Sequence, residues 1–97
     1  MEVMVHVTSR DAASVAAPLM RALTRAGAPG GCFFTNDGVR LLRDGEFIDA
    51  LAGAERAVVC EHSWDMAGGT ADDCPIERGS QTINSVLMAE AARLVSL

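Results

Sequence analysis

The sequence predicts an α/β fold, a three-layer α/β/α architecture around a parallel sheet of four or five strands. Apolar, β-branched runs of strand length recur along the chain, and segments with apolar residues at helical spacing lie between them. Strands that alternate with helices favour parallel pairing, with crossovers that place helices on the faces of the sheet. At 97 residues, the chain is expected to form one domain over residues 1–97.

The first strand and helix are predicted by a change in hydrophobic period. β-branched and apolar side chains occupy most of residues 3–8, which predicts a buried strand. Apolar residues at helical spacing then predict a helix over residues 11–26. Gly27 follows where a helix commonly ends, and Pro18 either interrupts this helix or marks its regular start.

The middle of the chain is expected to contain two more strands. Residues 31–35 predict the second strand, because an Asn-Asp-Gly turn follows them immediately. Residues 39–42 and 47–51 predict two short helical pieces. The third strand is expected over residues 56–60.

The last third of the chain begins with a short helical turn over residues 61–66 and a glycine- and aspartate-rich loop over residues 68–73. Gly79-Ser80 predicts the start of the last helix, and residues 94–97 predict a brief terminal strand. The apolar residues expected on one face of this helix are Ile83, Val86, Leu87, Ala91 and Leu94.

Charge and composition exclude several classes of function. The net charge of −5 argues against nucleic acid or an anionic membrane as a direct partner, because both require clustered cations. No stretch has the length of a membrane span, and the first residues lack the basic start of a signal peptide. All eight basic residues are arginine, which excludes Schiff-base chemistry on a lysine.

The cysteines favour a reducing compartment. Cys32, Cys60 and Cys74 are an odd number, which fits poorly with the disulfide framework of a secreted protein. We therefore expect a cytoplasmic protein whose cysteines are buried side chains, metal ligands or reactive thiols. Cys32 lies inside an apolar strand next to Phe33, which indicates a packed core thiol.

Cys60 is the leading candidate for a reactive group. It ends the apolar run of residues 57–60, at the point where the sequence turns polar. In an open parallel sheet, ligands and reactive groups gather outside the carboxyl ends of the strands. N–H groups at a helix start could stabilise a thiolate there. Free cysteine also serves as a small buried hydrophobe, so residue type alone leaves both interpretations open.

Three further residues are candidates for auxiliary roles at Cys60. Protonated His62 would favour the thiolate, whereas Glu61 would oppose it. Trp64 follows Cys60 by four residues and is expected either as a lid on the cysteine or as an anchor at a subunit contact. Cys74 would resolve a disulfide or persulfide on Cys60 if its loop folds back. Cys60, His62 and Cys74 also compose a weak set of zinc ligands.

Three segments resemble the DsrE/DsrF-like (DsrEFH-like) family of small sulfur-relay proteins. Residues 33–39 (FFTNDGV) are similar to the family's strand and the x-D-G-V turn after it. Residues 59–63 (VCEHS) are similar to its cysteine-bearing strand end, and residues 89–97 to its final helix and strand. The order and spacing of these segments extend the resemblance over nearly the whole chain.

The resemblance implies a sulfur carrier. In family members that transfer sulfur, the cysteine matching Cys60 accepts a persulfide and passes it to a partner protein. By this resemblance the chain acts like a sulfurtransferase in sulfur oxidation or tRNA thiolation, between sulfur donor and acceptor proteins. It needs no metal or organic cofactor and assembles as a homo-oligomer, a dimer, trimer or hexamer. The chain departs from the family at Glu61 and at residues 67–78, where relatives often place another strand.

Two alternatives to sulfur transfer stay open. The same fold could serve as a non-enzymatic oligomeric module in which Cys60 only packs at a strand end. The chain could also be a metal-binding module that uses Cys60, His62 and Cys74. Slow labelling of Cys60 by thiol reagents would favour the first alternative, and bound metal would favour the second.

Overall fold

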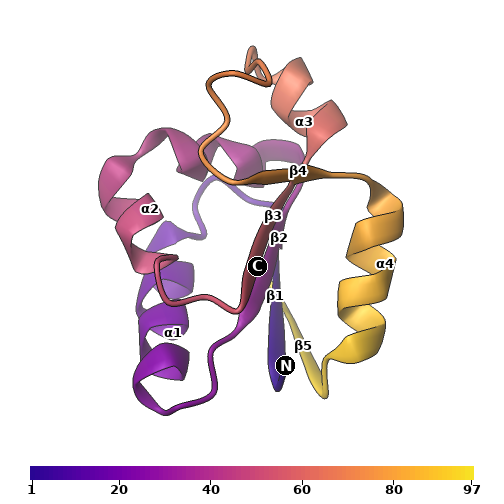
Figure 1. The fold of residues 1–97 in the computed structure, drawn as a ribbon. Coiled ribbons are helices and arrows are strands. Elements are labelled where there is room, and N and C mark those ends of the chain that lie inside the picture. The colour runs from indigo at the N-terminus through magenta and orange to yellow at the C-terminus, as the bar shows by residue number, and fades with distance from the viewer.

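Five strands and five helical segments make up the computed structural model, which describes all of residues 1–97. The strands are β1 (Val3–Val7), β2 (Gly31–Phe34), β3 (Arg56–Cys60), β4 (Glu77–Gly79) and β5 (Arg93–Ser96). The helices are α1 (Ala13–Arg25), the 3-10 helix η1 (Asn36–Arg43), α2 (Gly45–Ala50), α3 (Glu61–Met66) and α4 (Gln81–Glu90). The strands form one all-parallel sheet in the order β4-β3-β2-β1-β5, with helices on both faces (Figure 1). The predicted three-layer α/β/α fold is confirmed.

The order of the strands decides which face each helix covers. From β1 to β4, each new strand is added on the same side of the preceding one, so α1, η1 and α2 lie together on one face of the sheet (Figure 1). The chain then returns from β4 at one edge to β5 at the other, and α4 covers the opposite face along this return. The short helix α3 stands above the carboxyl ends of the strands.

The strands divide the hydrophobic core into two clusters, because successive side chains point to opposite faces of a sheet. The larger cluster lies on the α1 side and includes Phe34, whose ring meets the ring of Phe47 edge-on at 5.7 Å between centroids. The smaller cluster lies under α4 and consists of Met4, Phe33, Val58, Cys60 and Leu87. β2 is buried on both faces, as is typical of a central strand in a parallel sheet.

Most of the predicted elements are confirmed, with small changes at their ends. The third strand and the helical turn after it have the predicted bounds. Gly27 has a φ of +77° directly after α1, the left-handed conformation expected of a glycine at this position. Pro18 lies inside α1, which continues past it, so this proline does not mark the start of the helix. Within residues 67–78 the chain forms mainly loop, and β4 contributes only three residues.

The apolar face predicted for the last helix is wrong in part. Leu87 is fully buried against the sheet, but Val86 is 43% exposed. Neighbouring residues of a helix point about 100° apart, so the face that buries Leu87 turns Val86 away from the sheet. Leu94 lies in β5 and not on the helix.

The longest helix, α1, has 13 residues, whereas a membrane span takes about 20. No helix of the structure combines the length and the apolar character needed to cross a bilayer.

Gly38 permits the close approach of η1 to the end of β1, and its replacement by alanine tests this contact. A Cβ atom at this position would overlap the main-chain carbonyl of Val7 and lie 3.1 Å from the nitrogen of Thr8. Because these are main-chain atoms, the strand end itself must move, and Gly38→Ala is expected to lower the free energy of unfolding by about 2–3 kcal/mol in urea denaturation. Gly45→Ala is the control, since nothing lies within 4 Å of its Cβ position. Equal stability of the two variants would contradict the expectation.

Candidate functional site

Cys60 is placed where three strand ends meet at the carboxyl edge of the sheet. It is the last residue of β3 and immediately precedes α3. Thr35 follows β2, which pairs with β3 on one side, and Gln81 begins α4 shortly after β4, which pairs with β3 on the other. Cys60 itself is 5% exposed and packs in the cluster under α4.

Polar side chains surround the thiol and are linked by hydrogen bonds. The Ser63 hydroxyl lies 3.2 Å from the Thr35 hydroxyl and accepts from the main-chain N–H of Asn36 at 3.0 Å. The Gln81 amide donates from Nε2 to Thr35 Oγ1 at 3.4 Å, and Asn84 Nδ2 donates to Gln81 Oε1 at 3.2 Å. We call Cys60, Thr35, Ser63, Gln81 and Asn84 the Cys60 cluster.

The hydrogen bonds of the Cys60 cluster lower the pKa of the thiol. Burial acts to raise the pKa of Cys60, but donors to the thiolate outweigh it. Among the donors, the hydroxyl of Ser63 lowers the pKa most, followed by the main-chain N–H of Ser63 and the side-chain amide of Gln81. The main-chain N–H of His62 has a smaller effect. A hydroxyl has a single proton, so when Ser63 donates to Cys60 the proton between Ser63 and Thr35 must come from Thr35.

Cys32 shows what the same type of side chain does without such donors. It lies in β2, fully buried in the larger core cluster, and its thiol donates to the carbonyl of Arg56 at 3.8 Å. Burial raises the pKa of Cys32 from 9.0 to about 12. The prediction that Cys32 is a packed core thiol is confirmed, and the two buried thiols of the sheet have pKa values displaced in opposite directions.

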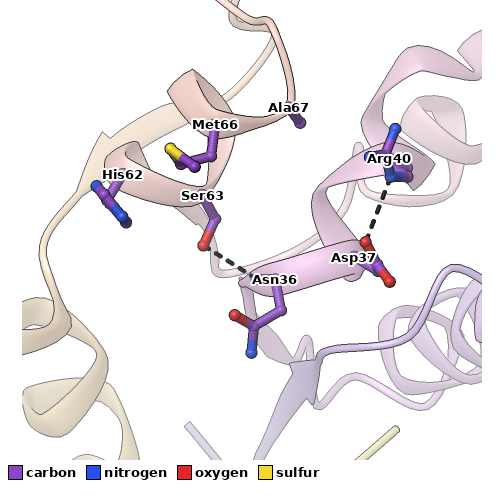
Figure 2. A pocket seen from close by; sticks show the side chains of 7 residues that line it. All are labelled: Asn36, Asp37, Arg40, His62, Ser63, Met66 and Ala67. Atoms are coloured by element: carbon purple, nitrogen blue, oxygen red, sulfur yellow. Dashed lines mark hydrogen bonds and ion pairs between the residues drawn. The ribbon is translucent and has the colours of Figure 1, made fainter.

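A cleft of about 380 Å³ opens beside the Cys60 cluster, between η1 and α3 (Figure 2). Its lining includes Asn36, Asp37 and Arg40 from η1 and His62, Ser63 and Met66 from α3. Ser63 belongs both to the cleft and to the Cys60 cluster, whereas Cys60 does not line the cleft. One serine side chain therefore connects the buried thiol with this solvent-filled space.

Asn36 lines the cleft and has an unusual backbone conformation. Its φ is +51°, a left-handed conformation that asparagine adopts more readily than most residues. This turn follows β2 directly and begins η1. It directs the Asn36 N–H to Ser63, the contact drawn as a dashed line in Figure 2. Nearby, Asp37 forms ion pairs with both Arg40 at 3.4 Å and Arg10 at 3.6 Å.

The predicted auxiliary residues separate into two groups. His62 lies on α3 beside Cys60, with an exposed side chain in the cleft. Trp64 is 1% exposed and belongs to the larger core cluster, not to the cluster that contains Cys60. Its Nε1 donates to the carbonyl of Thr70 at 2.8 Å, so the indole holds the following loop. The indole packs in the cluster on the other face of the sheet, so it does not lie as a lid on Cys60.

Cys74 is also directed away from Cys60. Its thiol donates to the carbonyl of Ile76 at 3.3 Å, and the side chain packs against the larger core cluster on the other face of the sheet. The structure contains no group of three histidine, cysteine or acidic side chains that could hold a metal ion. The predicted set of Cys60, His62 and Cys74 is therefore not assembled, because residues 67–76 fold over the α1 side of the sheet.

The sequence interpretation missed the polar residues of the Cys60 cluster. Thr35, Ser63, Gln81 and Asn84 have residue types that are common at strand ends and helix starts, so none of them stands out alone. The signal that could have found three of them is their placement. Thr35, Ser63 and Gln81 all lie within three residues of a strand end, and parallel strands bring these ends to one edge.

Comparison of the sequence with models of protein families and with curated proteins finds no match.

Proposed function

We propose that the protein is a sulfur carrier that holds a persulfide on Cys60 and passes the outer sulfur to a partner protein. The observation that carries the proposal is the convergence of hydrogen-bond donors on this one thiol at the carboxyl edge of the sheet. A thiolate is the nucleophile in sulfur exchange, and lowering the pKa increases its population at neutral pH. Cys32 has no such donors and is not suited to this chemistry.

The reaction is an exchange between a thiolate and a persulfide. The Cys60 thiolate attacks the outer sulfur of a donor R–S–SH, a new S–S bond forms at Cys60, and the donor S–S bond breaks. The electron pair of the broken bond leaves with the donor sulfur as R–S⁻, so no external oxidant or reductant is consumed. Attack by an acceptor thiolate on the outer sulfur of Cys60–S–SH then regenerates the Cys60 thiolate.

The cleft supplies a route to the thiol for this proposal. A donor sulfur placed in the cleft is separated from Cys60 by the Ser63 side chain, which contacts both. The polar lining of the cleft suits a donor that brings its own polar groups, such as a peptide or thiol cofactor with a terminal persulfide.

The proposal retains the partners implied by the family resemblance, which are sulfur donor and acceptor proteins and further copies of this chain. Large apolar side chains remain exposed on α4 and β5, namely Val86, Met88 and Leu94. Such residues support self-association, because burial in an interface removes apolar area from water.

Transfer of sulfur to Cys60 is tested by intact mass spectrometry. The reduced chain is incubated with a low-molecular-weight persulfide, and a mass increase of one sulfur atom is expected on the wild type. Cys60→Ser is expected to lose this adduct, because serine is not an acceptor of sulfane sulfur. Cys74→Ser is the matched control and should keep the adduct, since the Cys74 thiol lies on the other face of the sheet.

An absent adduct on the wild type, or an undiminished adduct on Cys60→Ser, would overturn the proposal. Slow alkylation of Cys60 at neutral pH would then favour the non-enzymatic oligomeric module, in which Cys60 is only a packing residue.

A further inference from the structure

The contact between α4 and Cys60 supports an inference about how the thiolate is maintained. Gln81 is the first residue of α4, and Gly79, two residues before it, pairs with Cys60 in the sheet. The Gln81 amide donates from Nε2 to Thr35 Oγ1 at 3.4 Å and is among the donors that lower the pKa of Cys60. We propose that Gln81 is a positioning residue for the Cys60 thiolate and that Asn84 fixes the direction of the Gln81 amide. The inference rests on Cys60 being the reactive thiol of the proposed function.

The direction of the amide decides whether Gln81 favours or opposes the thiolate. A side-chain amide has a donor on one side and an acceptor on the other. With its NH₂ group toward Cys60, Gln81 donates to the negative sulfur. Rotated by half a turn, it would present a carbonyl oxygen to the same charge. Asn84 Nδ2 donates to Gln81 Oε1 at 3.2 Å, and this bond holds the carbonyl away from Cys60.

The burial of Asn84 indicates that its hydrogen bond to Gln81 has a role beyond packing. Asn84 is 7% exposed, and its Oδ1 is buried without a hydrogen-bond partner. A buried acceptor without a partner is unfavourable, so packing alone would favour leucine, which has a similar volume. The side chain forms one hydrogen bond, which goes to Gln81. What asparagine provides here, and leucine cannot, is control of the Gln81 amide.

No charged side chain on the surrounding elements takes the place of this amide. Glu61 and His62 on α3 are exposed, and Arg78 on β4 forms an ion pair with an aspartate of α3 at 3.0 Å. His6 on β1 has a pKa lowered by burial, which disfavours the charged form of the ring. β2 carries no ionisable group besides its cysteine, and the one acidic residue of α4 stands at the end of the helix far from Cys60.

The test is the pH dependence of Cys60 alkylation by iodoacetamide in the full chain. Trypsin leaves Cys60 and Cys74 in one peptide, so all variants carry Cys74→Ser. Gln81→Met retains the length of the side chain and removes the donor, and it is expected to raise the apparent pKa of Cys60 by about one pH unit. Well below that pKa the thiolate fraction falls about tenfold while each thiolate becomes about threefold more nucleophilic, so alkylation slows about threefold.

A double-mutant cycle tests the role of Asn84. Asn84→Leu is expected to raise the apparent pKa of Cys60 by a smaller amount than Gln81→Met, and to have no further effect when combined with it. Ser85→Ala is the matched control, because this exposed hydroxyl on the same turn of α4 bonds only the main-chain oxygen of Gln81. Its titration midpoint should equal that of the parent.

Two results would overturn the inference. One is an unchanged midpoint of the Cys60 titration in Gln81→Met, and the other is an effect of Asn84→Leu on this midpoint that is as large in the Gln81→Met background as in the parent. Alkylation needs no sulfur donor, so the inference and the proposed function fail separately. A raised midpoint in Gln81→Met, together with no sulfur adduct on the wild type, would support the positioning role and overturn sulfur carriage alone.

Discussion

Raising the pH from 9 to 12 is expected to lower the free energy of unfolding by about 3 kcal/mol, through the single thiol of Cys32. Burial raises the pKa of Cys32 from 9.0 to about 12. The unfolded chain therefore ionises before the folded chain, and the stabilisation is full below pH 9 and lost as the pH rises toward 12. Between these two pKa values, the free energy of unfolding falls by about 1.4 kcal/mol per pH unit. The chain has neither lysine nor tyrosine, so the groups that usually titrate in this range are absent.

Urea denaturation at a series of alkaline pH values measures this slope, with Cys32→Ala as the control. The variant is expected to be less stable at neutral pH, because it leaves a small cavity, but nearly independent of pH above 9. Ionisation of Cys60 changes stability in the opposite direction to ionisation of Cys32, because the pKa of Cys60 is lowered in the folded state. Its stabilisation is present above pH 9 and lost as the pH falls through the folded pKa, so it adds no alkaline slope. An equal slope in Cys32→Ala would contradict the assignment.

Replacement of Trp64 by alanine is expected to lower the free energy of unfolding by about 3–5 kcal/mol. The indole is almost completely buried, and the Arg43 guanidinium lies 4.3 Å from the ring centroid. Gly69 packs directly on the ring, and no larger residue fits there. Removing the indole therefore leaves a cavity and releases the loop that Trp64 holds through Thr70. Because this is the only tryptophan, unfolding is followed by circular dichroism.

Trp64→Phe separates packing from the hydrogen bond. Phenylalanine fills much of the space but cannot donate to the Thr70 carbonyl, so a smaller loss of about 1–2 kcal/mol is expected. If Trp64→Ala were no less stable than Trp64→Phe, the indole would not be the packing anchor described above.

Much of the fold follows from local pattern. The bounds of β3 and α3 were predictable because an apolar run gives way to polar residues at one position, Cys60. The exposure of Val86 was not predictable, because it depends on how α4 is rotated about its axis against the sheet. Sequence period locates an apolar stripe, whereas packing against β-strand side chains decides which part of the stripe is covered.

The candidate site was predictable only at Cys60. The placement of Trp64 and Cys74 on the α1 side of the sheet depends on the path of residues 67–76, which have no periodic pattern. Gln81 comes to Cys60 because β4 pairs with β3, which places Gly79 opposite Cys60, and Asn84 follows about one turn later on α4. This pairing is a long-range feature. His62 was found because it lies beside Cys60 in sequence, but Ser63 was missed although it lies only three residues away, because a serine at a helix start is common. The residues that topology brings to Cys60 were missed as well.

The pairing of β5 with β1 has a consequence for the order in which the chain folds. Thr8 and Leu97 are 89 residues apart in sequence, yet the Thr8 hydroxyl donates to the Leu97 carbonyl at 3.1 Å. Contacts over such a separation form slowly, because the entropy of closing the intervening chain must be overcome first. α4 runs between β4 and this last strand, so the packing of α4 on the sheet is completed only with this closure. The two ends of the chain are therefore expected to join last, after the β2–β3 pairing that brings Thr35 next to Cys60.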